Sequence, residues 1–224
     1  MPLHLQKELG RLKKQILGLG AMVEERVRMA TRAMEQRDTE TAERILATDY
    51  EIDEREVEVE EECLKILALH QPVAVDLRFI TAVVKINNDL ERIGDEAVNI
   101  ARCVAIISRK EPVDMPQEFG PMSEKTQAML KSSLDALVNL DLDEAFRVLT
   151  LDDEVDRINS RIYDQVKERI GRTPDRVGTL INLMLISRYL ERIADHATNI
   201  AEEVIYMIEG EIVRHGKWDQ PDAE

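Results

Sequence analysis

The chain has 224 residues, enough for one large domain or two small ones, and 44% of them are hydrophobic, so it can fill a core. Only 4% are aromatic and 33% are charged, a composition typical of packed helices and unlike that of disordered or fibrous chains. With 30 basic and 45 acidic residues the formal net charge is −15, which disfavours nonspecific binding to nucleic acid or to anionic lipid. Metal cations and basic protein partners suit this charge better.

The sequence gives no reason to expect a membrane span or a signal peptide. No apolar run approaches the roughly 18 to 20 residues of a membrane span, and residues 1–8 lack the apolar core of a signal peptide. We therefore expect a cytoplasmic protein that does not insert into the membrane. Cys63 and Cys103 are too few for a disulfide framework and form no Cys-x-x-Cys motif, so we expect them to be buried core residues.

Apolar residues recur every three or four positions between the prolines, which predicts an all-α fold of six long helices. The predicted helices span residues 3–36, 39–69, 73–108, 121–139, 142–170 and 175–213. Residues 110–121 contain three prolines and a glycine, and they predict a linker between two groups of three helices.

The two groups repeat one another. Residues 90–101 match residues 190–201 at nine of twelve positions, and residues 42–53 correspond to residues 145–156. This pattern predicts an internal duplication and two pseudo-symmetric three-helix bundles. We assign the first repeat to residues 1–110, the linker to 111–121, the second repeat to 122–215 and a polar tail to 216–224.

Each repeat carries two acidic pairs spaced four residues apart, so each pair shares one helix face. If the second and third helices form an antiparallel hairpin, both pairs meet at one level about 30 Å from the turn. Four carboxylates about 6 Å apart repel by roughly 2 to 3 kcal/mol per pair at an effective dielectric constant of 20, and bound cations remove that cost. The first quartet is Asp49, Asp53, Glu91 and Asp95, and the second quartet is Asp152, Asp156, Glu191 and Asp195.

Ligands that are all oxygen favour Mg²⁺, Mn²⁺, Ca²⁺ or iron. Asn99 and Asn199 extend the two stripes, and His196 adjoins the second quartet, so all three are candidate further ligands. The alternatives are hydrogen bonds between helices for the asparagines and a surface position for His196. The alternative interpretation of the quartets is that they are two solvated acidic helix faces that the duplication repeated. Glu56 and Glu60 continue the first stripe without acidic counterparts in the second, and we expect them to be solvated.

Four arginines recur at equivalent positions of the two repeats. Arg92 and Arg192 each follow a proposed ligand, and we expect them to form salt bridges within the chain. Arg44 and Arg147 recur upstream of the acidic pairs. They are candidate contacts for a protein partner, with ordinary exposed helix arginines as the alternative.

The sequence shows no set of catalytic residues. It has no Gly-rich phosphate loop, no nucleophile elbow and no Glu-x-x-His motif of the kind that di-iron bundles use. We therefore expect a protein that is not an enzyme. The alternatives are a metal or phosphate storage or buffering protein and, with less support, a metal-dependent phosphoesterase.

Residues 71–78, QPVAVDLR, are followed by LERIGD at 90–95 and LERIAD at 190–195. In this combination the chain closely resembles the PhoU family of phosphate-transport accessory regulators, from about residue 5 to residue 213. The resemblance implies two similar three-helix bundles, with multinuclear clusters of iron or zinc held by the two quartets. The second hairpin turn departs from the pattern, because GRTP at 171–174 replaces QPVA at 71–74.

The resemblance also implies a role and partners. It implies a negative regulator of phosphate uptake and phosphate-starvation signalling, in the cytoplasm and peripheral to the inner membrane through its partners. Those partners are the ATPase of the high-affinity phosphate ABC transporter and a phosphate-sensing histidine kinase, and the protein is expected to be a homodimer. Phosphate itself would bind the acidic sites only when metal is present.

Overall fold

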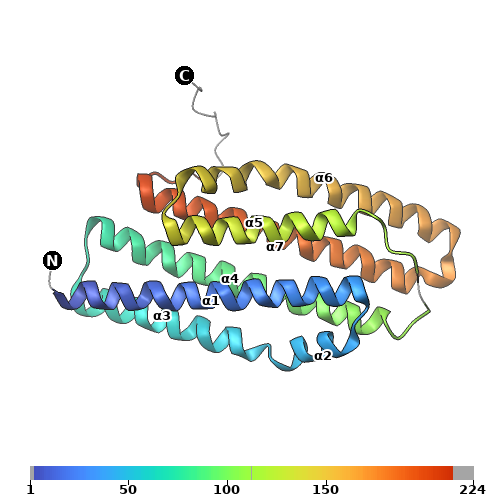
Figure 1. Cartoon of the computed structure of the whole chain (residues 1–224), viewed down its shortest axis with the longest axis horizontal. Helices are drawn as coiled ribbons and strands as arrows, with labels where there is room; N and C mark the ends of the chain where they lie inside the picture. Colours follow the sequence, from blue (N-terminus) through green and yellow to red (C-terminus); the bar gives the residue numbers. More distant parts are fainter. Residues whose placement is uncertain (1–2, 112, 214–224) are drawn as a thin grey trace, which may run out of the picture.

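The computed structural model describes residues 3–111 and 113–213, so the expected polar tail at 216–224 lies outside the described residues. The described residues contain helices and no strand, which confirms the all-α prediction. The elements, shown in Figure 1, are α1 (Leu3–Gln36), α2 (Thr39–Ala47), α3 (Tyr50–His70), α4 (Ala74–Ile107), α5 (Phe119–Asn139), α6 (Leu142–Arg172), the 3₁₀ helix η1 (Pro174–Arg176) and α7 (Val177–Glu209).

The two repeats use the same device to end their first helix and start the next. Arg37 after α1 and Leu140 after α5 both adopt left-handed backbone conformations, with φ of 53° and 52°. Asp38 and Asp141 follow, and each carboxylate accepts hydrogen bonds from backbone amides in the first turn of the next helix. Such an N-cap satisfies donors that have no partner inside the helix. The duplication therefore preserves the turn as well as the helices.

The helix predicted at 39–69 is interrupted at residues 48–49, which separate α2 from α3. The Thr48 carbonyl accepts a hydrogen bond from Arg26 Nη2 at 2.9 Å, and the Arg26 side chain is almost fully buried. The Thr48 hydroxyl donates back to the Arg44 carbonyl at 3.0 Å, a bond that bends helices. Position 151 of the second repeat holds leucine, and α6 runs through it without a break.

The last helix also differs from the prediction at both ends. The second hairpin turn forms η1 before α7 starts, whereas the first turn uses Gln71 in a left-handed conformation with φ of 45°. The helix ends at Glu209 rather than at residue 213, because Gly210 adopts φ of 82° and its amide bonds to the Tyr206 carbonyl. Glycine favours this left-handed C-terminal geometry because it has no Cβ.

The two repeats pack together through α4 and α7, which run antiparallel along the middle of the molecule (Figure 1). Lys85 on α4 pairs with Glu203 on α7 at 3.2 Å, and Arg192 on α7 pairs with Glu96 on α4 at 2.9 Å. The helices α1 and α3 cover α4, while α5 and α6 cover α7, and α1 contacts α5. The result is the predicted pair of three-helix bundles, joined along their third helices.

The two ion pairs fix how α4 and α7 are aligned along their lengths. In this alignment Gly94 of α4 lies opposite Ala194 of α7, its equivalent in the second repeat, near the midpoint of the two helices. Gly94 lies against α3 so closely that a Cβ there would be 3.0 Å from Ile52 Cδ1. Both hairpins therefore bring their acidic residues close to the middle of the molecule.

Cys63 and Cys103 are buried and free, as predicted. Burial raises the pKa of the Cys63 thiol to about 12 and that of Cys103 to about 11, so both are inert at neutral pH. Among the residues described, no helix is both long enough and apolar enough to cross a membrane.

Candidate metal centre

The first quartet gathers on the hairpin of α3 and α4, at the level that the sequence predicts. Asp49 lies at the break between α2 and α3, Asp53 one turn later, and Asp95 on α4. These three residues each offer a carboxylate oxygen within 4.8 Å of the others. Three negative groups this close favour a cation between them. The structure thus brings together three of the four predicted residues.

Glu91, the fourth member, lies one turn before Asp95 on α4. Its Oε2 atom is buried and accepts no hydrogen bond, although Arg92 Nε lies 3.4 Å away as an ion pair. A buried carboxylate oxygen without a hydrogen-bond donor is costly, and a metal ion is one group that removes this cost. The residues present therefore fit a metal ligand set.

The electrostatics of the first quartet agree with this geometry. Burial raises the pKa of Asp95, and the charges of Asp49 and Asp53 raise it further. Burial also raises the pKa of Glu91, followed by the charge of Asp95, while Arg92 opposes the shift. Both carboxyls therefore hold protons more tightly than in water, as expected for acids that face one another.

The carboxylates of the second quartet are more widely spaced than those of the first. Within the described part of the chain it does not bring three carboxylate oxygens within 4.8 Å of one another. Its members still interact, because burial and the charges of Glu191, Asp152 and Asp156 raise the pKa of Asp195 to about 6. Burial and the charge of Asp156 raise the pKa of Asp152, although the Thr198 hydroxyl donates to Asp152 at 3.4 Å. The second repeat thus has the same acidic set in a looser arrangement.

The side chains of Asn99, Asn199 and His196 make hydrogen bonds to acidic residues outside the quartets. The His196 ring nitrogen Nδ1 lies 2.8 Å from Asp89 on α4, and the Asn199 amide donates to the same carboxylate at 3.1 Å. The Asn99 amide donates to Glu96 at 3.2 Å. The bond of Asn199 is the hydrogen bond between helices that the sequence left as the alternative, whereas the bond of Asn99 lies within α4, and His196 joins the two repeats.

The repeated arginines divide into two kinds. Arg92 pairs with Glu91 and, at 3.9 Å, with Asp95, and Arg192 pairs with Glu96, which confirms the predicted salt bridges. Arg44 is exposed and lines a groove of about 450 Å³ between α1 and α2, beside Met22 and Met29. Arg147 is exposed on α6, where Glu144 lies 3.6 Å from it.

Glu56 differs from the prediction of a solvated side chain. It is half-buried, accepts a hydrogen bond from the Asn87 amide at 3.0 Å, and its pKa is raised by burial and by Glu60 and Asp53. With Glu60 it lines a cleft of about 590 Å³ between α3, α4 and α7. This cleft depends on how the two repeats pack, which the sequence pattern of one helix does not reveal.

Comparison with known proteins agrees with the duplication. The family model described as the PhoU domain matches the chain twice, at residues 16–104 and 120–204. The chain belongs to the PhoU family. Each of the two PhoU segments contains one quartet.

Relatives match this PhoU chain over nearly its whole length. The phosphate-specific transport system accessory protein PhoU homolog of Clostridium acetobutylicum is 36% identical over 93% of this chain and 95% of its own. The PhoU homolog of Aquifex aeolicus is also 36% identical, over 95% of this chain and 96% of its own length. The crystal structure of PhoU from Pseudomonas aeruginosa has a TM-score of 0.87 at 34% identity, covering 92% of this chain and 99% of its own.

A second crystal structure extends the comparison. The phosphate transport system regulatory protein PhoU from Streptococcus pneumoniae has a TM-score of 0.84 at 31% identity, covering 93% of this chain and 99% of that one. The fold expected from the resemblance is therefore confirmed.

Sequence reasoning missed two contributors to the candidate centre. Thr198, which donates to Asp152, occupies the position of Val98 in the first repeat, so no repeated pattern pointed to it. Burial raises the pKa of Glu191, and the charge of Arg188 opposes this shift; the counterpart of Arg188 in the first repeat is Asn88. An arginine one turn before a repeated acidic pair was the available signal for Arg188.

Proposed function

We propose that this PhoU family member is an accessory protein of phosphate-specific transport that restrains phosphate uptake and phosphate-starvation signalling. It would act as an adaptor between the ATPase of the phosphate ABC transporter and a phosphate-sensing histidine kinase. The observation that carries the proposal is the match of both repeats to the PhoU domain. The names of the relatives, accessory protein and regulatory protein of phosphate transport, support a role without catalysis.

We further propose that the two quartets hold metal ions, with iron or zinc clusters as the leading candidates and Mn²⁺, Mg²⁺ or Ca²⁺ as others. The oxygens of Asp49, Asp53 and Asp95 and the buried Oε2 of Glu91 support this in the first repeat. The raised pKa of Asp195 supports it in the second. Bound metal would supply positive charge on an otherwise acidic face, where phosphate or an acidic group of a partner could bind.

The chain's own residues then have defined tasks. The quartets hold the metal, and the hairpins of rigid helices present it at the middle of each repeat. Arg44 and Arg147 are our proposed contacts with a protein partner, because both are exposed and equivalent in the two repeats. A homodimer would double each of these surfaces.

The direct test measures binding to purified partners. The metal-loaded chain is titrated against the cytoplasmic part of the histidine kinase and against the transporter ATPase, and kinase autophosphorylation is followed in parallel. We expect binding to both partners and reduced autophosphorylation at high phosphate. Saturable binding of many metal ions per chain with no affinity for either partner would contradict the adaptor role and favour metal storage.

The same assay separates the two parts of the proposal. The double variant Asp53→Asn, Asp156→Asn removes one carboxylate charge from each quartet, and Asp164→Asn on the exposed face of α6 is its matched control. If metal is regulatory, the double variant binds the partners more weakly than the control does. Equal binding by all variants would retain the adaptor and remove metal from its mechanism.

A further inference from the structure

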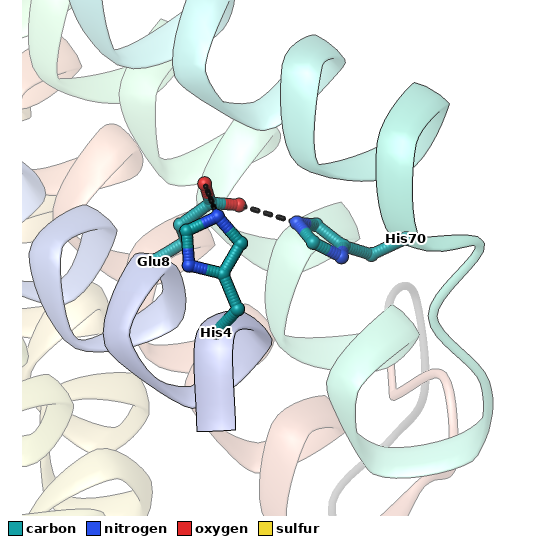
Figure 2. Close-up of side chains that lie close together, drawn as sticks. All are labelled: His4, Glu8 and His70. Atoms are coloured by element: carbon teal, nitrogen blue, oxygen red, sulfur yellow. Dashed lines mark hydrogen bonds and ion pairs between the residues drawn. The ribbon is translucent and has the colours of Figure 1, made fainter. Parts of the chain in front are cut away.

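A second group of metal-ligating side chains lies far from both quartets, where the start of α1 meets the end of α3 (Figure 2). It consists of His4, Glu8 and His70. The Nε2 atom of His70 lies 2.6 Å from Glu8 Oε2, and Nε2 of His4 lies 3.5 Å from Glu8 Oε1. The two imidazole rings meet edge to face with centroids 5.7 Å apart. Both histidines thus point at one carboxylate.

The group is partly enclosed by the protein, and the ammonium group of Lys65 lies close enough to compete with a metal ion for Glu8. The Glu8 and His70 side chains are only 13% and 16% exposed, whereas His4 is 73% exposed and free to change its rotamer. Lys65 Nζ lies 4.0 Å from Glu8 Oε1, at the limit of an ion pair.

We propose that His4, Glu8 and His70 form a site for one Zn²⁺ ion. Two imidazoles and one carboxylate are a ligand set that zinc uses in proteins, with water in the fourth position. This nitrogen-containing set differs from the oxygen-only quartets, so it prefers zinc-like transition metals over Mg²⁺ or Ca²⁺.

The geometry needs only a small adjustment. Ligand atoms about 2.1 Å from a tetrahedral zinc ion lie about 3.4 Å from one another. Here the three ligand atoms already lie within 4.8 Å of one another. His70 Nε2 must move out from its 2.6 Å contact with Glu8 Oε2, and His4, the most exposed of the three, can turn its ring toward both. Because His4 and Glu8 are one turn apart on α1, both face the same direction.

A bound zinc ion would clamp the first turn of α1 to the last turn of α3. That turn of α3 leads directly into the hairpin turn at residues 71–73, where Gln71 adopts a left-handed conformation. The ion would thus fix the end of the hairpin whose other end carries the first quartet. This site is independent of the proposed regulatory function, and it stands or fails separately from the quartets.

The test uses the tag-free, full-length chain carrying Asp53→Asn and Asp156→Asn, so that metal bound by the quartets is reduced. Co²⁺ is titrated first, because a four-coordinate site gives intense visible absorption, and Zn²⁺ is then added to displace it. The variants are His4→Ala and His70→Ala, and His196→Ala is the matched control because His196 pairs with Asp89 instead. Circular dichroism confirms that each variant folds.

We expect one equivalent of four-coordinate Co²⁺ that zinc displaces, with affinity lowered at least about tenfold by His4→Ala and by His70→Ala but unchanged by His196→Ala. Zinc should also slow hydrogen exchange in the first turns of α1. Since His4 is exposed, its replacement leaves the fold intact. A parent chain without saturable four-coordinate Co²⁺, or a His4→Ala variant that binds as tightly as the parent, would overturn the proposal.

Discussion

The strongest test of the electrostatic account is the substitution Asp195→Asn in metal-free protein. Burial, followed by Glu191, Asp152 and Asp156, raises the pKa of Asp195 from 3.8 to about 6. The native state therefore binds this proton more tightly than the unfolded chain does. Its contribution to stability is present below about pH 4 and is lost as the pH rises to about 6.

The magnitude follows from the shift. A difference of about two pKa units corresponds to about 3 kcal/mol if the site were fully shielded from water. Neighbouring groups partly desolvate the Asp195 carboxyl, but its side chain is still open to solvent on α7, so solvent screening reduces this to about 1 to 1.5 kcal/mol. Removing the charge should therefore raise the free energy of unfolding by about 1 kcal/mol near pH 7.5 and leave it nearly unchanged near pH 4.

The assay is urea denaturation followed by circular dichroism, with a chelator present, at both pH values. Asp164→Asn on α6 is the control, because its side chain is exposed and lies outside the quartets. A variant that is less stable than wild type near pH 7.5, or whose change in stability is the same at both pH values, would refute the reasoning. When metal is added, the order should reverse, because wild type gains a ligand that the variant lacks.

Three further predictions concern how the helices are held. Arg26→Ala should lower the free energy of unfolding by about 2 kcal/mol in urea melts, because it removes the buried donor to the carbonyl at the break between α2 and α3; an unchanged midpoint would contradict this. Gly94→Ala places a methyl group against Ile52 Cδ1, and Ile52→Val removes that atom. In a double-mutant cycle, Ile52→Val should therefore lower the free energy of unfolding by about 1 kcal/mol less in the Gly94→Ala protein than in wild type. Additive effects of the two substitutions would argue against the crowding. Arg192→Ala should cost about 2 kcal/mol by leaving the buried Glu96 carboxylate without its cation, and Glu96→Gln should recover part of that loss in the double variant.

The helices and the quartets could be predicted from the sequence because both depend on local periodicity and on a duplication. Hairpin geometry needs only the position of the turn, so Asp49 and Asp95 could be placed at one level without coordinates. The second hairpin has a different turn. Its acidic pairs on α6 and α7 still lie the same number of residues from that turn, whatever conformation the turn adopts. This is why the electrostatic coupling around Asp195 matches the expectation.

What could not be predicted depends on contacts between elements far apart in the sequence. The break before α3 is held by Arg26 from α1, and no pattern within residues 39–69 shows that donor. His196 and Asn199 were expected near the second quartet because they lie close to it in the sequence. They bind Asp89 instead, because α7 packs antiparallel to α4 and presents that face to the other repeat.

The site of His4, Glu8 and His70 was missed for the same reason. His4 and Glu8 show the four-residue spacing of a shared helix face, which was the available signal. The third ligand, His70, comes from the far end of another helix, and only the packing of α1 against α3 brings it there.

The central claim is that the quartets are metal sites, and metal content tests it most directly. Elemental mass spectrometry on tag-free protein, after loading with iron, zinc, manganese or magnesium, compares wild type with the double variant Asp53→Asn, Asp156→Asn. We predict at least one ion per repeat in wild type and its loss in the double variant. Substoichiometric metal in wild type, or equal metal in both proteins, would contradict the account and leave the quartets as solvated acidic faces.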